Sequence, residues 1–205
     1  SLTLSGAEIL NLAETGNNGY TGTMAASTLH GATLVVLGGH AGSTDAFTLT
    51  VAATDSTINL GGLNFNTAQF GADAGDNVIV NGSAITTALS ITGTNVKDTI
   101  TGGSAADTIV GGAGADVIVG GAGADNISSA SGDNNITGGD GGDTMTGGTG
   151  NDTFTMDGVD DLAGDVIAGG TGTDTITIGA GADTQHDLST ATISSVEALI
   201  ITTET

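Results

Sequence analysis

The chain has 205 residues and an extreme charge balance, with 23 Asp and Glu residues against one base, Lys97, giving a formal net charge of −22. This charge excludes nucleic acid and anionic membrane surfaces as partners, and the absence of Cys excludes disulfides and thiolate metal sites. The longest apolar runs, such as 34–37 and 198–201, are far shorter than the about 20 residues that a membrane-spanning helix needs.

Strongly acidic chains are often disordered. Here, however, 38% of the residues are apolar, and Val, Ile, Leu and Thr are spread along the whole chain. We therefore expect a folded protein whose charge is balanced by polyvalent cations, in preference to a disordered acidic tail. No charged n-region followed by an apolar h-region opens the sequence, so no classical signal peptide is expected at Ser1.

Residues 1–92 are predicted to be a β-rich segment of irregular short strands separated by glycine. Strands are expected at 33–37, 47–51, 57–60, 78–80 and 88–92, and helical periodicity is visible only at 5–14. The stretch 71–82 resembles a degenerate copy of the repeat that follows, with Asp76 in its acidic position. The segment either continues into that repeat as one solenoid or forms a separate β-sandwich.

From residue 93 the chain repeats a nine-residue pattern, G-G-x-G-x-D-x-U-x, in which U is a large apolar residue. Complete units run 111–119, 120–128, 138–146, 147–155 and 169–177, and weaker units run 93–101, 102–110 and 129–137, the last with Asn134 in the Asp position. The last three residues of each unit predict a short strand whose middle residue faces inward. These inward residues are Ile100, Ile109, Ile118, Ile127, Ile136, Met145, Phe154 and Ile176.

Two units make one coil with a strand in each of two parallel sheets. Because stacked strands lie about 4.7–4.9 Å apart, Asp residues eighteen positions apart are expected to lie above one another. One stack would hold Asp98, Asp116, Asn134 and Asp152, and the other Asp107, Asp125 and Asp143. Calcium binds about six to eight oxygens at about 2.3–2.6 Å, so an ion fits between successive coils, whereas Mg²⁺ demands a tighter octahedral site. Neither thiolates nor paired histidines are present for zinc.

After Thr155 the repeat loses its register. Asp165, Asp174 and Asp183 keep a nine-residue spacing, but Asp152 and Asp165 are thirteen apart. The segment 156–164 is therefore expected to bulge from the roll. Its acids (Asp157, Asp160 and Asp161) either form a separate calcium site or lie on a solvated loop.

The two ends of the chain resemble each other. Residues 4–12 align with 193–201, and each carries Ser-x-x-Glu, a capping-box or tight-turn pattern, followed by apolar residues. The match is either a coincidence or the start of a second copy. Residues 187–205 are predicted to be a C-terminal strand that makes an assembly contact.

The units at about 93–186 resemble the RTX (repeats-in-toxin) family. The resemblance implies an all-β, right-handed parallel β-roll, or β-solenoid, that binds several Ca²⁺ ions and is exported unfolded through a type I secretion channel. Asp carboxylates and the glycine-rich turns would hold the ions. The metal-site residues predicted in this way are Asp98, Asp107, Gly112, Gly114, Asp116, Gly121, Gly123, Asp125, Gly139, Gly141, Asp143, Gly148, Gly150, Asp152, Asp165, Gly170, Gly172, Asp174 and Asp183. Asn134, Lys97, Val96 and Ala105 depart from the pattern, so sites beside them should be weaker or absent.

Repeats of this kind occur in proteins of several functions and do not fix one. The Thr-, Ala-, Gly- and Ser-rich composition is similar to that of RTX-type bacterial S-layer proteins. We predict a calcium-dependent structural protein of a bacterial surface layer, matrix or filament, which associates with itself or with tandem copies. Any cell-surface glycan anchor would lie elsewhere in the full chain. The alternative is a calcium-driven folding and export module of a type I secreted toxin, hydrolase or giant adhesin.

An enzymatic role is not predicted. The sequence contains no G-x-S-x-G, H-E-x-x-H or P-loop motif. His30, His40 and His186 share no spacing and are expected to be surface or structural residues, and Glu8 and Glu197 are expected to cap turns.

Overall fold

The computed structural model describes residues 77–156, 162–179 and 189–202 with their side chains, and it describes five earlier strands by their backbone. In this part of the chain every regular element is a strand, and no helix is present that could cross a membrane. The five earlier strands are β1 (Ala7–Asn11), β2 (Thr21–Ala25), β3 (Thr33–Leu37), β4 (Ala46–Thr50) and β5 (Thr57–Asn59). The later strands are β6 (Asn77–Asn81), β7 (Ser90–Thr92), β8 (Asp98–Thr101), β9 (Thr108–Val110), β10 (Val117–Ala122), β11 (Asn126–Ser128), β12 (Asn135–Asp140), β13 (Thr144–Thr149), β14 (Thr153–Met156), β15 (Val166–Thr171), β16 (Thr175–Ile178), β17 (Thr192–Ser194) and β18 (Ala198–Ile201).

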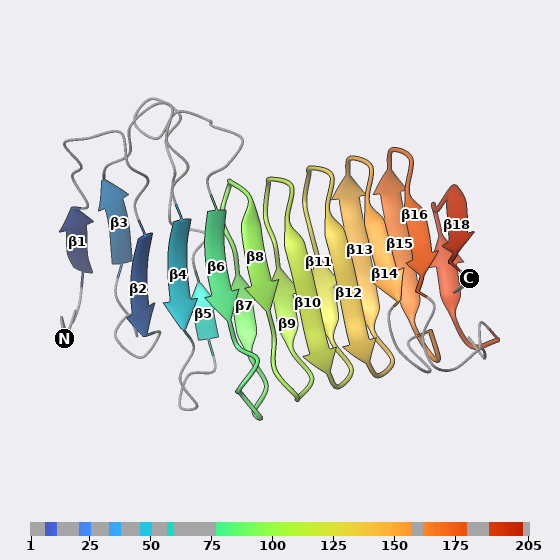
Figure 1. The fold of residues 1–205 in the computed structure, drawn as a ribbon, viewed down its shortest axis with the longest axis horizontal. Helices are drawn as coiled ribbons and strands as arrows, with labels where there is room; N and C mark the ends of the chain where they lie inside the picture. Colours follow the sequence, from blue (N-terminus) through green and yellow to red (C-terminus); the bar gives the residue numbers. More distant parts are fainter. Residues whose placement is uncertain are drawn as a thin grey trace.

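Two parallel sheets form the walls of an elongated solenoid, with β1 near one end and β18 at the other (Figure 1). The even-numbered strands from β2 to β18 make a nine-stranded sheet, and the odd-numbered strands from β5 to β17 make a seven-stranded sheet. β1 pairs with β3, also in parallel. The expected all-β parallel β-solenoid is confirmed.

The early strands belong to the same architecture as the repeats. β4 pairs with β6, which in turn pairs with β8, and β5 pairs with β7. The strands predicted before residue 93 agree with the observed ones to within about two residues. The helical periodicity at 5–14 was misleading, because Ala7–Asn11 forms β1 and gains a parallel partner in β3. β2 was not predicted, since Gly22 and two threonines break its apolar pattern.

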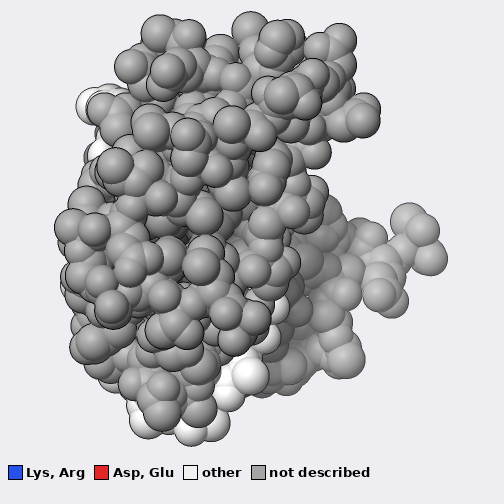
Figure 2. Space-filling view, turned by 90° about the vertical axis from the view of Figure 1, so that its left-hand side faces the viewer, with Lys and Arg blue, Asp and Glu red and all other residues white. Residues whose placement is uncertain are grey.

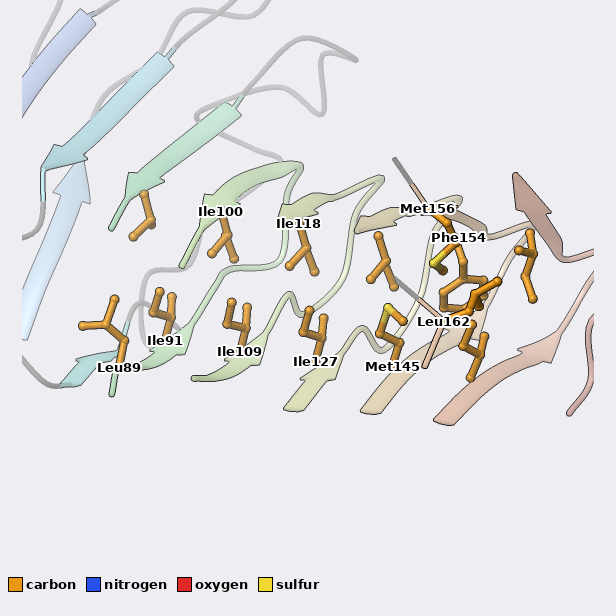
Figure 3. Close-up of a cluster of buried hydrophobic side chains, with 14 of the residues drawn as sticks. Leu89, Ile91, Ile100, Ile109, Ile118, Ile127, Met145, Phe154, Met156 and Leu162 are labelled. Atoms are coloured by element: carbon orange, nitrogen blue, oxygen red, sulfur yellow. The ribbon is translucent and has the colours of Figure 1, made fainter. Parts of the chain in front are cut away.

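The core consists of two facing columns of apolar side chains, one from each sheet (Figure 3). Paired positions such as Ile118 and Ile136 in one sheet, or Ile109 and Ile127 in the other, lie directly above one another and are fully buried. Every inward residue predicted from the repeat is at most 1% exposed. Their outward neighbours are partly or fully exposed, as the period of two requires.

The break in the repeat is absorbed with little change to the roll. Thr144 pairs with Val166 and Thr153 pairs with Thr175, so these coils are 22 residues long where earlier coils have 18. The predicted bulge at 156–164 was too wide, because Met156 ends β14 and Leu162 packs in the core, each 1% exposed. Burying the apolar surface of these two side chains is favourable, which explains their inward position. Asp157, Asp160 and Asp161 lie outside the described residues, as do Asp76, the three histidines and Asp183.

The turns depend on glycine at two positions of each complete unit. All ten turn glycines predicted at the metal sites have positive φ, between 102° and 142°. At Gly139, whose φ is 102°, an added Cβ would strike the carbonyl oxygen of Gly121 one coil earlier. Glycine is therefore required both by conformation and by the close approach of stacked turns.

The Gly139→Ala substitution is expected to lower the free energy of unfolding by more than about 1 kcal/mol, because alanine resists positive φ and the backbone beneath cannot yield. Gly142→Ala is the matched control in the same turn, since its φ is not positive and its nearest neighbours lie 3.5 Å or more from the added Cβ. That change is expected to stay within about 0.5 kcal/mol. Urea unfolding in saturating calcium measures both, and equal losses would contradict this account of the turns.

Candidate metal centre

The acidic residues of the repeat form two buried columns, one along each edge of the roll. The first acid column comprises Asp98, Asp116, Asn134, Asp152 and Asp174, followed by Glu197, and the second acid column comprises Asp107, Asp125, Asp143 and Asp165. The Asp and Asn members are at most 2% exposed. The two predicted stacks are thus present and extend beyond the break in the repeat.

Each column is held together by a hydrogen-bond ladder. The backbone N–H of one member donates to a side-chain oxygen of the member one coil later, as from Asp107 to Asp125 Oδ1 (2.7 Å) and from Asp152 to Asp174 Oδ1 (2.8 Å). At the C-terminal end the longer side chain of Glu197 takes this place and accepts from the Asp174 N–H (2.7 Å). One oxygen of each carboxylate therefore serves the backbone, which offsets part of the cost of burying it.

The second carboxylate oxygen is the one available to a ligand. The Oδ2 atoms of Asp125, Asp152 and Asp174 are buried and accept no hydrogen bond. A buried oxygen of this kind costs about 1–3 kcal/mol, and more when it carries charge. Buried carboxylate oxygens that would be stabilised by a cation thus recur along the roll.

Backbone carbonyls converge on the same places. A methyl group added at Gly120 would strike both Asp125 Oδ2 and the carbonyl oxygen of Gly138, which comes from the next coil. The corresponding pair at Gly147 is Asp152 Oδ2 and the Gly169 carbonyl. Carboxylate and carbonyl oxygens are the donors that calcium prefers. They can lie close together here because the first residue of the unit is glycine, so these residues fit the expected ion.

Nowhere among the described residues do three His, Cys, Asp or Glu side chains converge on one point. This follows from the geometry, since the carboxylates are spread along columns with one per coil. An ion here would take one or two carboxylates and complete its shell with turn carbonyls, as hard oxygen-seeking cations do.

The carboxylates nearest the N-terminus differ from the others. Asp98 Oδ2 accepts from the Thr94 N–H (2.7 Å) and hydroxyl (3.0 Å), and Asp107 Oδ2 accepts from the Gly103 N–H (2.6 Å). Asp116 Oδ2 lies 3.3 Å from the Ser129 hydroxyl. Weaker sites were expected in the units carrying Val96 and Ala105, which are the units of Asp98 and Asp107, and that expectation stays a prediction.

Burial also changes the acidity of these groups in the metal-free protein. The pKa of Asp98 is raised to about 7, that of Asp116 to about 6 and that of Asp125 to about 7, chiefly by desolvation. At Asp98 and Asp125, neighbouring carboxylates contribute to the increase. Desolvation also raises the pKa of Asp152. Backbone hydrogen bonds, from Thr94 to Asp98 and from Asp107 to Asp125, oppose the shift but do not cancel it.

These shifts predict how the calcium-free protein responds to pH. A carboxyl whose pKa rises from 3.8 in the unfolded chain to about 7 in the fold, as at Asp125, takes up a proton on folding. Its contribution to stability is complete below pH 3.8 and is lost as the pH rises through about 7. In EGTA, β-structure measured by far-UV circular dichroism is therefore expected to increase between about pH 8 and about pH 5. Saturating calcium is expected to weaken this dependence, because the bound cation favours the ionised form. A spectrum independent of pH in EGTA would contradict the prediction.

The hydrogen-bond ladder and the place of Glu197 in it were not predicted from the sequence. Its Ser-x-x-Glu pattern predicted a cap on its own turn, whereas Glu197 accepts from Asp174 in the preceding coil. The available signal was the position of Glu197, 23 residues after Asp174, close to the length of a coil after the break.

The family model described as the RTX calcium-binding nonapeptide repeat matches the chain in four copies, at residues 92–127, 120–154, 128–163 and 163–185. The expected RTX repeats are therefore present, and such repeats are a calcium-binding structural type of domain. Neither the curated proteins nor the solved structures gave a match to this chain.

Proposed function

Since the chain carries RTX calcium-binding nonapeptide repeats, we propose that it is a calcium-dependent structural protein of a bacterial surface layer, matrix or filament. The observation that carries this proposal is the set of buried Oδ2 atoms, at Asp125, Asp152 and Asp174, that face backbone carbonyls with no donor between them. Bound calcium would supply the positive charge that the acid columns require.

The protein's own residues would prepare and shield the sites. The ladder fixes each Oδ1, so that Oδ2 points toward the first glycine of its unit. The apolar columns pack against the strands that follow each turn and exclude water from the roll. Modules that bind calcium outside cells do so at about 10⁻⁴–10⁻³ M, so the roll would remain unfolded inside a cell and fold after export. RTX repeats occur in secreted bacterial proteins, which supports an extracellular location.

Assembly is proposed from the two ends of the solenoid. In the last coil, Ile193, Leu199 and Ile201 continue the inward columns in register but are 40%, 49% and 59% exposed. Within the described residues, no strand follows β17 or β18 in either sheet. The next strand in the alternating order would pair with β17, and β1, which pairs with β3 in a separate two-stranded sheet, lies at the opposite end of the molecule. Figure 2 views the molecule from that end, where few of the described residues are visible. We propose that this end of a second copy continues the roll after β18.

Light scattering and electron microscopy in millimolar calcium test the proposal. The native chain should form filaments or sheets, and the double variant Leu199→Asp with Ile201→Asp should remain monomeric, because charges at the terminal face oppose stacking. Thr108→Asp is the control, since Thr108 is exposed on β9 in the middle of the roll. A native chain that folds with calcium but stays monomeric at high concentration would instead support the folding and export module.

A further inference from the structure

From Asp116 to Asn134, the first acid column contains protein groups at the second polar atom of each side chain, where Asp125 in the second acid column has none. Asn134 stands in the Asp position of unit 129–137, and Ser129 stands where complete units have their first glycine. Both side chains are buried, at 2% and 6% exposure. In the complete units, an added Cβ at that first position would strike the Asp oxygen. A Cβ added at Gly111 would lie 3.2 Å from the Ser129 hydroxyl, so the side chain of Ser129 occupies the space beside Gly111 and Asp116 in the preceding coil.

The amide of Asn134 is oriented by the ladder. Its Oδ1 accepts from the Asp116 N–H (3.0 Å), so its Nδ2 must face the other way. There Nδ2 lies 2.8 Å from Asp152 Oδ1, 2.8 Å from the Gly132 carbonyl and 3.4 Å from the Gly147 carbonyl. Gly147 is the first glycine of the next coil in this column, as Gly138 is for Asp125. The amide nitrogen thus faces the kind of oxygens that a cation would face.

Two further donors extend this pattern toward the N-terminus. The Ser129 hydroxyl lies 3.3 Å from Asp116 Oδ2, and the hydroxyl and N–H of Thr94 lie within 3.0 Å of Asp98 Oδ2. From Asp98 to Asn134, each side chain in the first acid column therefore has a protein partner at its second polar atom. Asp125, in the adjacent column at the same level of the roll, has no such partner.

We propose that Thr94, Ser129 and Asn134 replace calcium in the N-terminal half of the first acid column, so that this stretch binds no ion. Calcium binding is then confined to the second acid column from Asp125 onward and to the first acid column from Asp152 onward. The two edges of the roll therefore differ at the level of Asp116 and Asp125, where Asp116 Oδ2 has a protein donor and Asp125 Oδ2 has none. The inference rests on the proposed function, because it assigns sites within the same array.

The number of calcium ions bound per chain, measured by equilibrium dialysis against saturating calcium, tests the assignment. Asp116→Asn and Asp125→Asn are a matched pair, since each keeps the Oδ1 acceptor of the ladder and removes a single negative charge. Asp116→Asn is expected to leave the ion count unchanged, whereas Asp125→Asn is expected to lower it. Ser129→Gly combined with Asn134→Asp removes the Ser129 hydroxyl and the Asn134 amide donor and restores the carboxylate, and it is expected to add an ion. Circular dichroism in calcium verifies that each variant is folded.

The outcomes separate the inference from the function. Loss of an ion from Asp116→Asn, equal to the loss from Asp125→Asn, would overturn the inference, as would an unchanged count in a folded double variant. If the double variant does not fold, the matched pair alone decides. A native chain that binds no calcium at all would instead refute the proposed function.

Discussion

Chelation of calcium is expected to abolish most of the β-sheet signal of this protein. In the native roll, carboxylates of successive coils lie well within the Debye length, about 10 Å at 0.1 M salt, and repel one another. Oδ2 atoms at Asp125, Asp152 and Asp174 also remain buried with no donor. Since the unfolded chain has no preformed site, the free energy of calcium binding becomes free energy of folding.

Far-UV circular dichroism in EGTA, followed by addition of calcium, measures this effect. The β spectrum should disappear in EGTA and return reversibly when calcium is added. The midpoint calcium concentration should be about 10⁻⁴–10⁻³ M, the typical range of affinity for extracellular modules. Magnesium at the same ionic strength is the control and should restore little structure, because it holds its waters and demands octahedral geometry. An unchanged spectrum in EGTA would exclude coupling between calcium and folding.

The second large effect is expected at Asp125, compared with Asp107 in the same column. Each residue supplies an Oδ1 that accepts a backbone N–H, from Asp107 and Leu89 respectively, so alanine removes one ladder bond in both cases. They differ at Oδ2, which is buried without a donor at Asp125 but accepts from the Gly103 N–H at Asp107. Asp125→Ala is therefore expected to remove a metal ligand, whereas Asp107→Ala is expected to remove only protein contacts.

Calcium titrations of Asp125→Ala and Asp107→Ala compare the two effects. Asp125→Ala is expected to raise the calcium midpoint for folding by about tenfold or more, equivalent to about 1.4 kcal/mol. Asp107→Ala is expected to reduce stability at saturating calcium by about 1–3 kcal/mol, since Leu89 and Gly103 lose their acceptor, with a smaller shift of the midpoint. Equal midpoint shifts would show that the two carboxylates bind metal alike.

The solenoid could be predicted from the sequence because its period is local. A strict repeat of nine residues fixes both the inward position, as at Ile118, and the stacking of Asp116 on its neighbours eighteen residues away. The width of the break was misjudged because the repeat says nothing about Met156 and Leu162, whose burial depends on space in the core. β1 was ambiguous for the same reason, since its strand conformation depends on pairing with β3, 26 residues away.

The nine-residue consensus could not predict in full which carboxylates have a protein donor at Oδ2 and which do not. Gly103 and Gly121 occupy the same position of their units, yet only Gly121 has positive φ, at 115°. The N–H of Gly103 donates to the carboxylate of its own unit, whereas Asp125, in the unit of Gly121, has an Oδ2 with no donor. The residue at this position is glycine in both units. The backbone conformation therefore decides which carboxylate Oδ2 accepts a hydrogen bond from the protein. Asn134 did signal a departure from the pattern, but the sequence did not show what its amide contacts.

Anomalous diffraction from crystals grown in calcium locates each ion and so identifies which carboxylates bind metal. Ions are expected between Asp125 Oδ2 and the Gly138 carbonyl and between Asp152 Oδ2 and the Gly169 carbonyl, with none beside Asn134. Acid columns without ions in a folded crystal grown at millimolar calcium would contradict this expectation.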